Sequence, residues 1–258
     1  MLLLGLIGFL GVGLSLGLLG GGGSILAVPV LIYAMGLPVS QAVPMSLPVV
    51  GMAAAVGAFA RWRKQQLRVT TAISFAAVAM VAAFASARLG SGIPDRPRLI
   101  LFVAVMMIAA TVMWRRSRQQ KIGDTQEIPV HDPANAAHSS TRLTMIVAAM
   151  VVGTLTGLVG VGGGFMIVPA LVGVLALPMP QAIATSLAVI ALNTMAAGAG
   201  WWGRVTLDWT LTAAVTAAAL VGMAIGIRLA PRFSARTLTR AFAVLLVLVS
   251  VVMVGMEL

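Results

Sequence analysis

Charged residues divide the chain into six long stretches that contain none, and the pattern of their lengths occurs twice. The stretches cover residues 1–60, 69–87 and 99–114, and then 143–203, 209–227 and 241–256. Their lengths are 60, 19 and 16 residues, followed by 61, 19 and 16. Because a membrane-spanning helix takes about 20 apolar residues, each long stretch has room for up to three passes and each short one for a single pass.

The repeat is also visible residue by residue when the chain is shifted by 140 positions. Residues 15–47 then align with residues 155–187 without a gap, and 14 of these 33 positions are identical. The identical residues of the first copy are Gly17, Leu18, Gly20, Gly22, Gly23, Val28, Pro29, Leu31, Leu37, Pro38, Gln41, Ala42, Ser46 and Leu47. A period this long indicates two membrane halves. We therefore predict a first membrane repeat over 1–115, a polar linker over 116–141 and a second membrane repeat over 142–258.

The predicted fold is an all-α polytopic membrane protein with eight full transmembrane helices and two short segments after glycine-rich helix breaks. The expected segments are 2–19, 25–36 (short), 40–60, 69–90 and 98–115, then 142–159, 165–177 (short), 181–202, 208–230 and 237–256. Basic residues gather at 61–68 and 115–121 in the first half but at 228–240 in the second, which favours two inverted-topology repeats. Each half then needs an odd number of passes. The short segments supply the fifth pass if they cross, which places both termini outside, or they are re-entrant.

The composition excludes most other classes of protein. Hydrophobic residues make up 60% of the chain and charged residues 9%, whereas soluble domains are nearer half apolar and a quarter charged. The net charge of +11 does not indicate a nucleic-acid partner, because the arginines stand at the ends of apolar stretches, as they do beside lipid headgroups. The chain has no cysteine, no intramembrane carboxylate pair and no cluster of metal-ligating residues. We therefore expect a protein of the lipid bilayer that is not an enzyme, with no catalytic residue, metal or cofactor.

Paired glycine runs are the sharpest chemical feature of the sequence. The first copy holds Gly20, Gly21, Gly22, Gly23 and Ser24 before Pro29, and the second holds Gly160, Gly162, Gly163 and Gly164 before Pro169. Each glycine costs a helix about 1 kcal/mol relative to alanine, so we predict helix breaks or hinges at Gly20, Pro29, Gly160 and Pro169. Broken helices at matching places in two halves are typical of a transporter site, where free N–H groups and a positive helix end can bind an anion. Close helix packing is the alternative interpretation of these glycines.

Polar side chains on the next predicted helix of each half could complete such a site. Gln41 and Ser46 in the first half match Gln181 and Ser186 in the second, and Thr185 lies beside Ser186. These side chains can donate hydrogen bonds to anionic oxygens, although serine and threonine also bond between membrane helices. The predicted substrate-binding residues are Gly21, Gly22, Gly23, Ser24, Gln41, Ser46, Gly162, Gly163, Gly164, Gln181, Thr185 and Ser186.

The glycine motifs resemble those of a known family. The sequences GGGGSILAVPVL over 20–31 and GVGGGFMIVPAL over 160–171 are similar to the repeated motif of the TauE/SafE sulfite exporter family, also called the 4-toluene sulfonate uptake permease family. The resemblance covers nearly the whole chain, although Ser24 stands where the second copy has Gly164. It implies a secondary transporter of sulfite, sulfonates, sulfoacetate or related anions in a bacterial inner membrane. A passive anion channel and a non-transporting membrane scaffold stay open as alternatives, and surface glycines would permit a homodimer.

Overall fold

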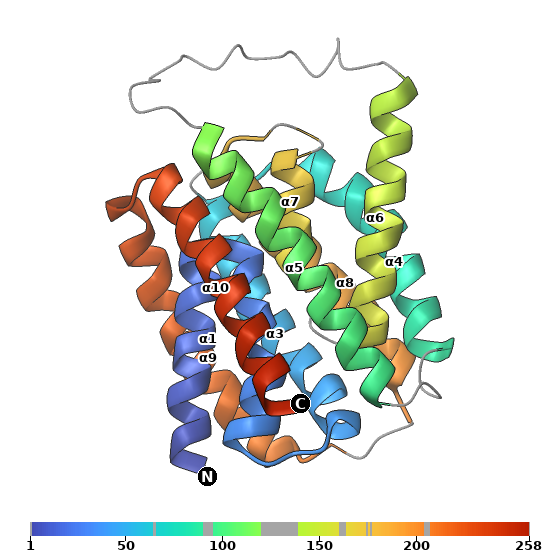
Figure 1. Cartoon of the computed structure of the whole chain (residues 1–258), viewed down its shortest axis with the longest axis vertical. Helices are drawn as coiled ribbons and strands as arrows, with labels where there is room; N and C mark the ends of the chain where they lie inside the picture. The colour runs from blue at the N-terminus through green and yellow to red at the C-terminus, as the bar shows by residue number, and fades with distance from the viewer. Residues whose placement is uncertain are drawn as a thin grey trace.

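The chain folds into a bundle of long helices (Figure 1). The computed structural model describes residues 2–63, 66–89, 95–119, 139–159, 164–173, 175, 177–203 and 207–257, and these residues form helices and turns without a strand. Eight helices among them have 18 to 25 residues: α1 (Leu2–Leu19), α3 (Val39–Trp62), α4 (Val69–Leu89), α5 (Asp95–Gln119), α6 (Ser139–Val159), α8 (Met179–Trp201), α9 (Trp209–Leu229) and α10 (Ala235–Glu257). The shorter ones are η1 (Gly20–Leu26), α2 (Ala27–Pro29), η2 (Val30–Ala34), α7 (Gly164–Gly173) and η4 (Ala230–Arg232).

Several of these helices are long and apolar enough to cross a membrane. Five candidate spans lie in the described part of the chain, at Leu2–Ala34, Val39–Trp62, Val69–Leu89, Met179–Trp201 and Trp209–Arg232. Large apolar side chains such as Leu3, Val81 and Met195 point outward on these spans and are about 70% exposed. An outer surface of this kind is stable only in contact with lipid. The prediction of an all-helical, multi-pass membrane protein is therefore confirmed.

The helix bounds follow the predicted segments closely, with differences around the glycines and the linker. The segment expected at 25–36 starts directly after α1, because the glycine run forms the 3₁₀ helix η1 from Gly20 onward. The segment expected at 165–177 ends earlier, since α7 stops at Gly173. Helix α5 continues to Gln119 and α6 begins at Ser139, so both extend into the predicted linker. The residues between these two helices lie outside the described ranges.

Helices of the two halves pack against each other in matching pairs. Helix α1 packs on α9 and α6 packs on α4, while α3 packs on α8 and α5 on α10. Gly13 of α1 meets the backbone of Ala219, and Gly153 of α6 meets the backbone of Ala79. A shift of 140 positions converts the first contact into the second, so the two crossings share one register. Small residues permit this approach because they let two backbones touch.

Alanine at Gly13 or Gly153 is expected to destabilise the bundle. A Cβ atom at either position would overlap the carbonyl of the facing helix, and overpacking of this kind costs about 1–3 kcal/mol. Gly11 on α1 and Gly198 on α8 have no atom within 4 Å of a Cβ and serve as matched controls. Thermal unfolding in detergent should show a lower Tm for Gly13→Ala and Gly153→Ala. A Tm equal to that of the Gly11→Ala control would show that these crossings are not close.

Candidate functional site

The first glycine run turns the chain at the end of α1. Helix α1 stops at Leu19, and Gly20 has φ +66, in the left-handed region that a residue with a Cβ rarely adopts. All residues of Gly20–Ser24 are buried. The Ser24 hydroxyl donates a hydrogen bond of 2.7 Å to the carbonyl of Gly21. The α-helix therefore ends where the sequence predicted a break, but the next turn is 3₁₀ helix rather than open backbone.

Neither proline interrupts the helical path of its segment in the structure. Pro29 has φ −54 and ψ −40 and passes directly into the π-helical turn η2, and Pro169 lies inside α7. Each of the two prolines lies five residues or more beyond its glycine run. Pro169 is the sixth residue of α7, so the N–H that it lacks costs the helix one hydrogen bond, to the carbonyl of Phe165.

The two glycine runs meet backbone to backbone inside the bundle. A Cβ built on Gly21 would overlap the Gly164 carbonyl and lie 2.9 Å from the Gly164 Cα. A Cβ built on Gly164 would lie 2.8 Å from Cγ1 of Ile190 on α8. Side chains larger than hydrogen are therefore excluded on both sides of this contact. The predicted residues Gly160, Gly162 and Gly163 lie outside the described ranges.

Ser186 of the second half lies against the turn of the first half. A Cβ on Gly20 would be 2.9 Å from the Ser186 Oγ and 3.0 Å from Cγ2 of Ile183. Ser186 is fully buried, and its hydroxyl donates a 2.9 Å hydrogen bond to the Ile183 carbonyl. The hydroxyl proton is thus held on the helix while the oxygen keeps lone pairs beside Gly20.

Gln41 and Ser46 lie far from this group, because α3 and α8 run antiparallel. Gly51 faces Thr194 and Gly57 faces Leu187, so residue numbers rise on one helix as they fall on the other. This register separates Ser46 from Ser186 by about 13 residues, or about 20 Å at 1.5 Å per residue. Gln41 is exposed in the first turn of α3, and Ser46 is buried, with its hydroxyl donating 2.8 Å to the Val43 carbonyl. The structure therefore does not bring the four matched polar residues to one point.

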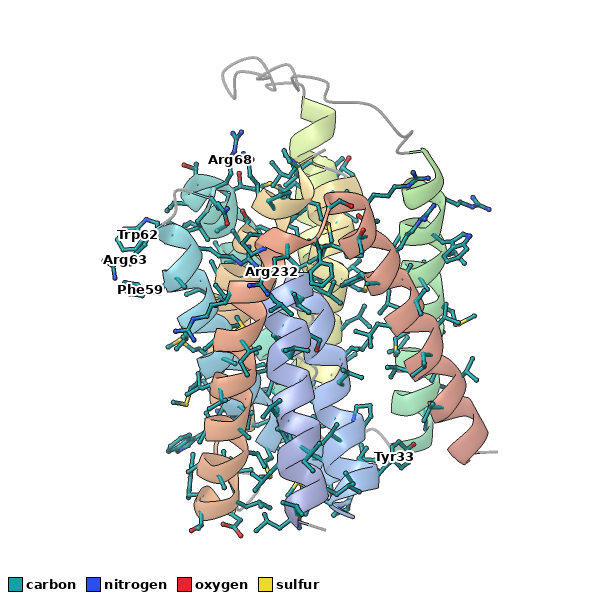
Figure 2. All side chains as sticks on the ribbon, turned by 90° about the vertical axis from the view of Figure 1, so that its left-hand side faces the viewer. Tyr33, Phe59, Trp62, Arg63, Arg68 and Arg232 are labelled. Atoms are coloured by element: carbon teal, nitrogen blue, oxygen red, sulfur yellow. The ribbon has the colours of Figure 1, made fainter. Side chains whose placement is uncertain are left out.

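Gln181 and Thr185 instead meet an arginine that follows α3. The Arg68 Nε donates a 3.1 Å hydrogen bond to Oε1 of Gln181, and the Arg68 backbone N–H donates to the Thr185 Oγ1 at 3.4 Å. Thr185 is fully buried and Gln181 is partly exposed. Figure 2 shows Arg63 and Arg68 at one end of the bundle and Tyr33 at the other. A guanidinium group thus lies at the start of α8, where it bonds to Gln181, five residues before Ser186.

Comparison with known proteins identifies the family. The sequence profile of the family "Sulfite exporter TauE/SafE" matches residues 4–253. The chain belongs to the TauE/SafE family. It is 30% identical over 250 residues to a "Probable membrane transporter protein" of Xylella fastidiosa (strain 9a5c). The aligned region covers 93% of this chain and 90% of that protein. A protein of the same description from Xylella fastidiosa (strain Temecula1 / ATCC 700964) is 30% identical over 247 residues, with coverage of 93% and 90%. No solved structure matches the chain.

These comparisons, together with the apolar spans, show a multi-pass membrane transporter of the TauE/SafE family. The resemblance noted on the glycine motifs is confirmed over nearly the whole chain. A transporter of this family has a non-enzymatic role.

Arg61 is a buried cation of this TauE/SafE transporter that the sequence pattern did not single out. It lies in the last turn of α3 and is only 5% exposed. Its Nη2 donates a 2.7 Å hydrogen bond to the Gly17 carbonyl, and its Nε has no partner among the described residues. Gly17 is one of the last four residues of α1, and the carbonyls of these residues have no N–H donor within the α-helix. The C-terminal end of a helix is also negative, which favours a cation there. Arg61 therefore holds the end of α1 just before the glycine turn.

A signal for Arg61 and Arg68 was present in the repeat itself. The shift of 140 positions pairs Arg61 with Trp201 and Arg68 with Asp208. Both cations are thus absent from the equivalent positions of the second half. The charge pattern placed both arginines in one loop, because Arg61 follows the first charge-free stretch and Arg68 precedes the second. Sequence spacing does not show that Arg61 belongs to α3 or that Arg68 bonds to α8.

Asn193 is a second polar residue that the predicted set left out. It is fully buried in α8, and neither its Oδ1 nor its Nδ2 has a hydrogen-bond partner among the described residues. It lies seven residues after Ser186 and three after Ile190, and this spacing places all three on one face of the helix. The equivalent residue in the first half is Ala53. The same helix face that touches Gly20 and Gly164 therefore carries an unpaired amide.

Leucine at position 193 is expected to raise the thermal stability of the protein. A buried polar group without a partner costs about 1–3 kcal/mol, and leucine fills a similar volume without that cost. The Tm in detergent should rise for Asn193→Leu, and transport should fall if the amide contacts the passing anion. The control is Thr194→Val, since Thr194 already bonds the Ile190 carbonyl at 2.8 Å. A lower Tm for Asn193→Leu would show that the amide is satisfied in the folded protein.

A large cavity lies between α3 and α8 at the end away from Arg68. Its volume is about 840 Å³, and its walls are mostly apolar. Pro44, Gly51 and Thr194 line it from the two helices, and Trp201, Trp202 and Trp209 line it at the outer end. Trp202 and Trp209 are exposed, which suits the interface anchors expected of tryptophan. The cavity therefore lies at the end of the α3–α8 pair opposite to the one where Arg68 bonds to Gln181.

Proposed function

We propose that this TauE/SafE transporter carries small anions of oxidised sulfur, such as sulfite, sulfonates or sulfoacetate, across the inner membrane of a bacterium. The contact of Gly21 with Gly164 carries the proposal. Helix α7 begins at Gly164, so the N–H groups of its first turn have no partner within the helix and can bind an anion, as helix ends do in broken-helix transporters. Ser186 and Thr185 add hydroxyl groups on the adjoining face of α8, and Arg61 and Arg68 add positive charge.

We also propose that the eight long helices all cross the membrane and form two inverted repeats. The short segments 20–34 and Gly164–Gly173 supply the fifth pass that inversion requires of each half. The antiparallel α3–α8 pair and the shared register of the α1–α9 and α6–α4 crossings support this arrangement. Under inversion the equivalent helices run in opposite directions, as α3 and α8 do. The basic 61–68 loop would then face the cytoplasm, and the apolar cavity between α3 and α8 would lie toward the outside.

Transport would follow from alternating exposure of the glycine contact. In this structure the Arg68–Gln181 hydrogen bond ties the 61–68 loop to α8, while the cavity at the other end of α3 and α8 is open space. Opening the arginine end requires this bond to break and the two helices to tilt about their crossing near Gly51 and Thr194. Movement of this kind around a fixed midplane site is the usual mechanism of transporters with inverted repeats.

Ligand-dependent melting of the purified protein tests the proposed substrate class. The panel holds sulfite, thiosulfate, sulfoacetate, taurine, an arylsulfonate, sulfate, phosphate and acetate. An anion that binds only the folded state raises the Tm, by the equivalent of about 2.7 kcal/mol at 100 times its Kd. We expect a saturable shift with at least one sulfur anion and none with acetate. Equal shifts with every anion, or none with any, would contradict the proposed substrate class.

A further inference from the structure

Arg68 occupies a position that local helix electrostatics disfavours. It directly precedes α4, and its carbonyl accepts the first helical bond, from Ala72 N at 2.9 Å. The positive end of a helix favours acidic groups and disfavours cations. The equivalent residue before α9 is Asp208, whose Oδ1 accepts a 3.0 Å bond from Leu211 N, as an N-terminal cap should. One repeat therefore caps this helix with a carboxylate, and the other places a guanidinium there.

The second guanidinium reaches the same loop. Arg61 Nη1 donates to Oε1 of Gln66 at 3.4 Å, two residues before Arg68. Arg61 is buried, its Nε is unpartnered, and neither Arg61 nor Arg68 has a carboxylate partner among the described residues. Burying a charge without a counter-charge is costly. Within the described ranges the two cations thus lack a compensating anion, which a bound ligand would supply.

The hydrogen-bonding groups around Arg68 suit an oxyanion. Gln181 and Thr185 lie in the first two turns of α8, whose positive end adds to that of α4. A guanidinium presents five N–H donors in a planar fork that matches two oxygens of one anion. The Thr185 hydroxyl and the Gln181 amide can donate to further oxygens. No described acidic side chain lies at this end, since Asp208 precedes α9 at the end that holds the cavity.

We propose that Arg68, with Arg61 behind it, forms an oxyanion-recognition site at the start of α8 that selects doubly charged sulfur anions over zwitterionic ones. The inference rests on the proposed function and names the substrate class of the same transporter. Two cations without acidic partners stabilise a dianion such as sulfoacetate. They repel the ammonium group of taurine, which carries the same sulfonate on an otherwise similar chain. The ligand displaces the Arg68–Gln181 hydrogen bond, so recognition and opening of this end are linked.

Matched variants of one loop test the proposal. Arg68→Gln removes the cation that contacts α8, and Arg63→Gln removes an exposed cation five residues earlier in the same segment. Binding of sulfoacetate and taurine is measured by the Tm shift across a concentration series. We expect wild type and Arg63→Gln to bind sulfoacetate at least tenfold more tightly than taurine. Arg68→Gln should lose most of this preference, and Arg68→Lys should keep part of it, because lysine retains the charge without the planar fork.

The outcomes separate the site from the transporter function. Sulfoacetate binding and preference in Arg68→Gln equal to those of Arg63→Gln would overturn the proposed site while leaving the transporter function intact. An absence of binding and flux for all sulfur anions in wild type would overturn the proposed function itself. The Tm values of the two glutamine variants without ligand show whether both proteins are folded. If Arg68→Gln is not folded, Arg68→Lys is used in its place.

A lipid phosphate offers the same oxygen chemistry, so its contribution is measured separately. Binding is compared in lipid-free detergent and after addition of phosphatidylglycerol. We expect the Arg68-dependent preference for sulfoacetate in both conditions. A Tm shift that depends on Arg68, appears with phosphatidylglycerol and is absent with sulfoacetate would assign the arginines to lipid and overturn the proposal.

Discussion

Alanine in place of Gly21 is expected to abolish transport. The added Cβ would overlap the Gly164 carbonyl and approach its Cα. Neither atom can move without shifting backbone, since Gly164 is itself held against Ile190. The two glycine runs would therefore separate, and the N–H groups proposed to bind the anion would move with them. We expect flux below one-hundredth of wild type, which corresponds to about 2.7 kcal/mol or more at about 1.4 kcal/mol per factor of ten.

Two further variants show whether this loss reflects the site or the fold. Gly11→Ala introduces the same methyl group on α1 where no atom lies within 4 Å of it, and its flux should equal that of wild type. The Cβ added by Gly20→Ala would lie 2.9–3.0 Å from side-chain atoms and close to the backbone of Ile183. The left-handed φ of this position costs alanine about 1–2 kcal/mol. We expect Gly20→Ala to remain folded with reduced flux. Full transport by folded Gly21→Ala protein would show that the glycine contact is not the site.

Methionine in place of Arg61 is expected to be the second most damaging change. It removes the 2.7 Å bond to the Gly17 carbonyl, and a hydrogen bond to a charged group contributes about 1.5–3 kcal/mol. It also removes the buried charge that lies beside the glycine turn. The Tm should fall, and flux should fall more than tenfold because the turn loses both its anchor and its positive charge.

Two control variants test separately whether the charge of Arg61 and its position matter. Arg61→Lys keeps the charge and should retain part of both the Tm and the flux. Arg63→Met removes an exposed arginine two residues away and should change neither. An Arg61→Met protein with wild-type flux would contradict the link between the arginine and the turn, whatever its Tm.

The sequence predicted the helices well because a membrane imposes a simple rule on it. Apolar stretches of fixed length, interrupted by arginine, reproduce the bounds of α1 without error and those of α4 and α9 to within a residue or two. The break at Gly20 was also predictable, because four glycines cannot maintain an α-helix. The contact of that run with Gly164 does not follow from the repeat alone, because inversion brings equivalent positions together only near the midplane.

The grouping of side chains could not be predicted in the same way. Equal sequence positions suggested one site for Gln41, Ser46, Gln181 and Ser186, yet antiparallel α3 and α8 carry equivalent residues toward opposite ends. Arg61 appeared to be a loop cation because it is the first charge after 60 neutral residues. Its burial depends on a hydrogen bond to the carbonyl of Gly17, which belongs to another helix. The residues around Arg61 in the sequence do not indicate that contact.

Saturable anion flux in proteoliposomes tests whether the contact of Gly21 with Gly164 is a transport site. Wild type, Gly11→Ala and Gly21→Ala are reconstituted at equal density, and uptake of sulfite and of sulfoacetate is measured against increasing external concentration. We expect saturable uptake of at least one of these anions by wild type and Gly11→Ala, and none above empty vesicles for Gly21→Ala. Uptake that rises without saturation, or that is equal in folded Gly21→Ala and wild type, would contradict a transport site at the glycine contact.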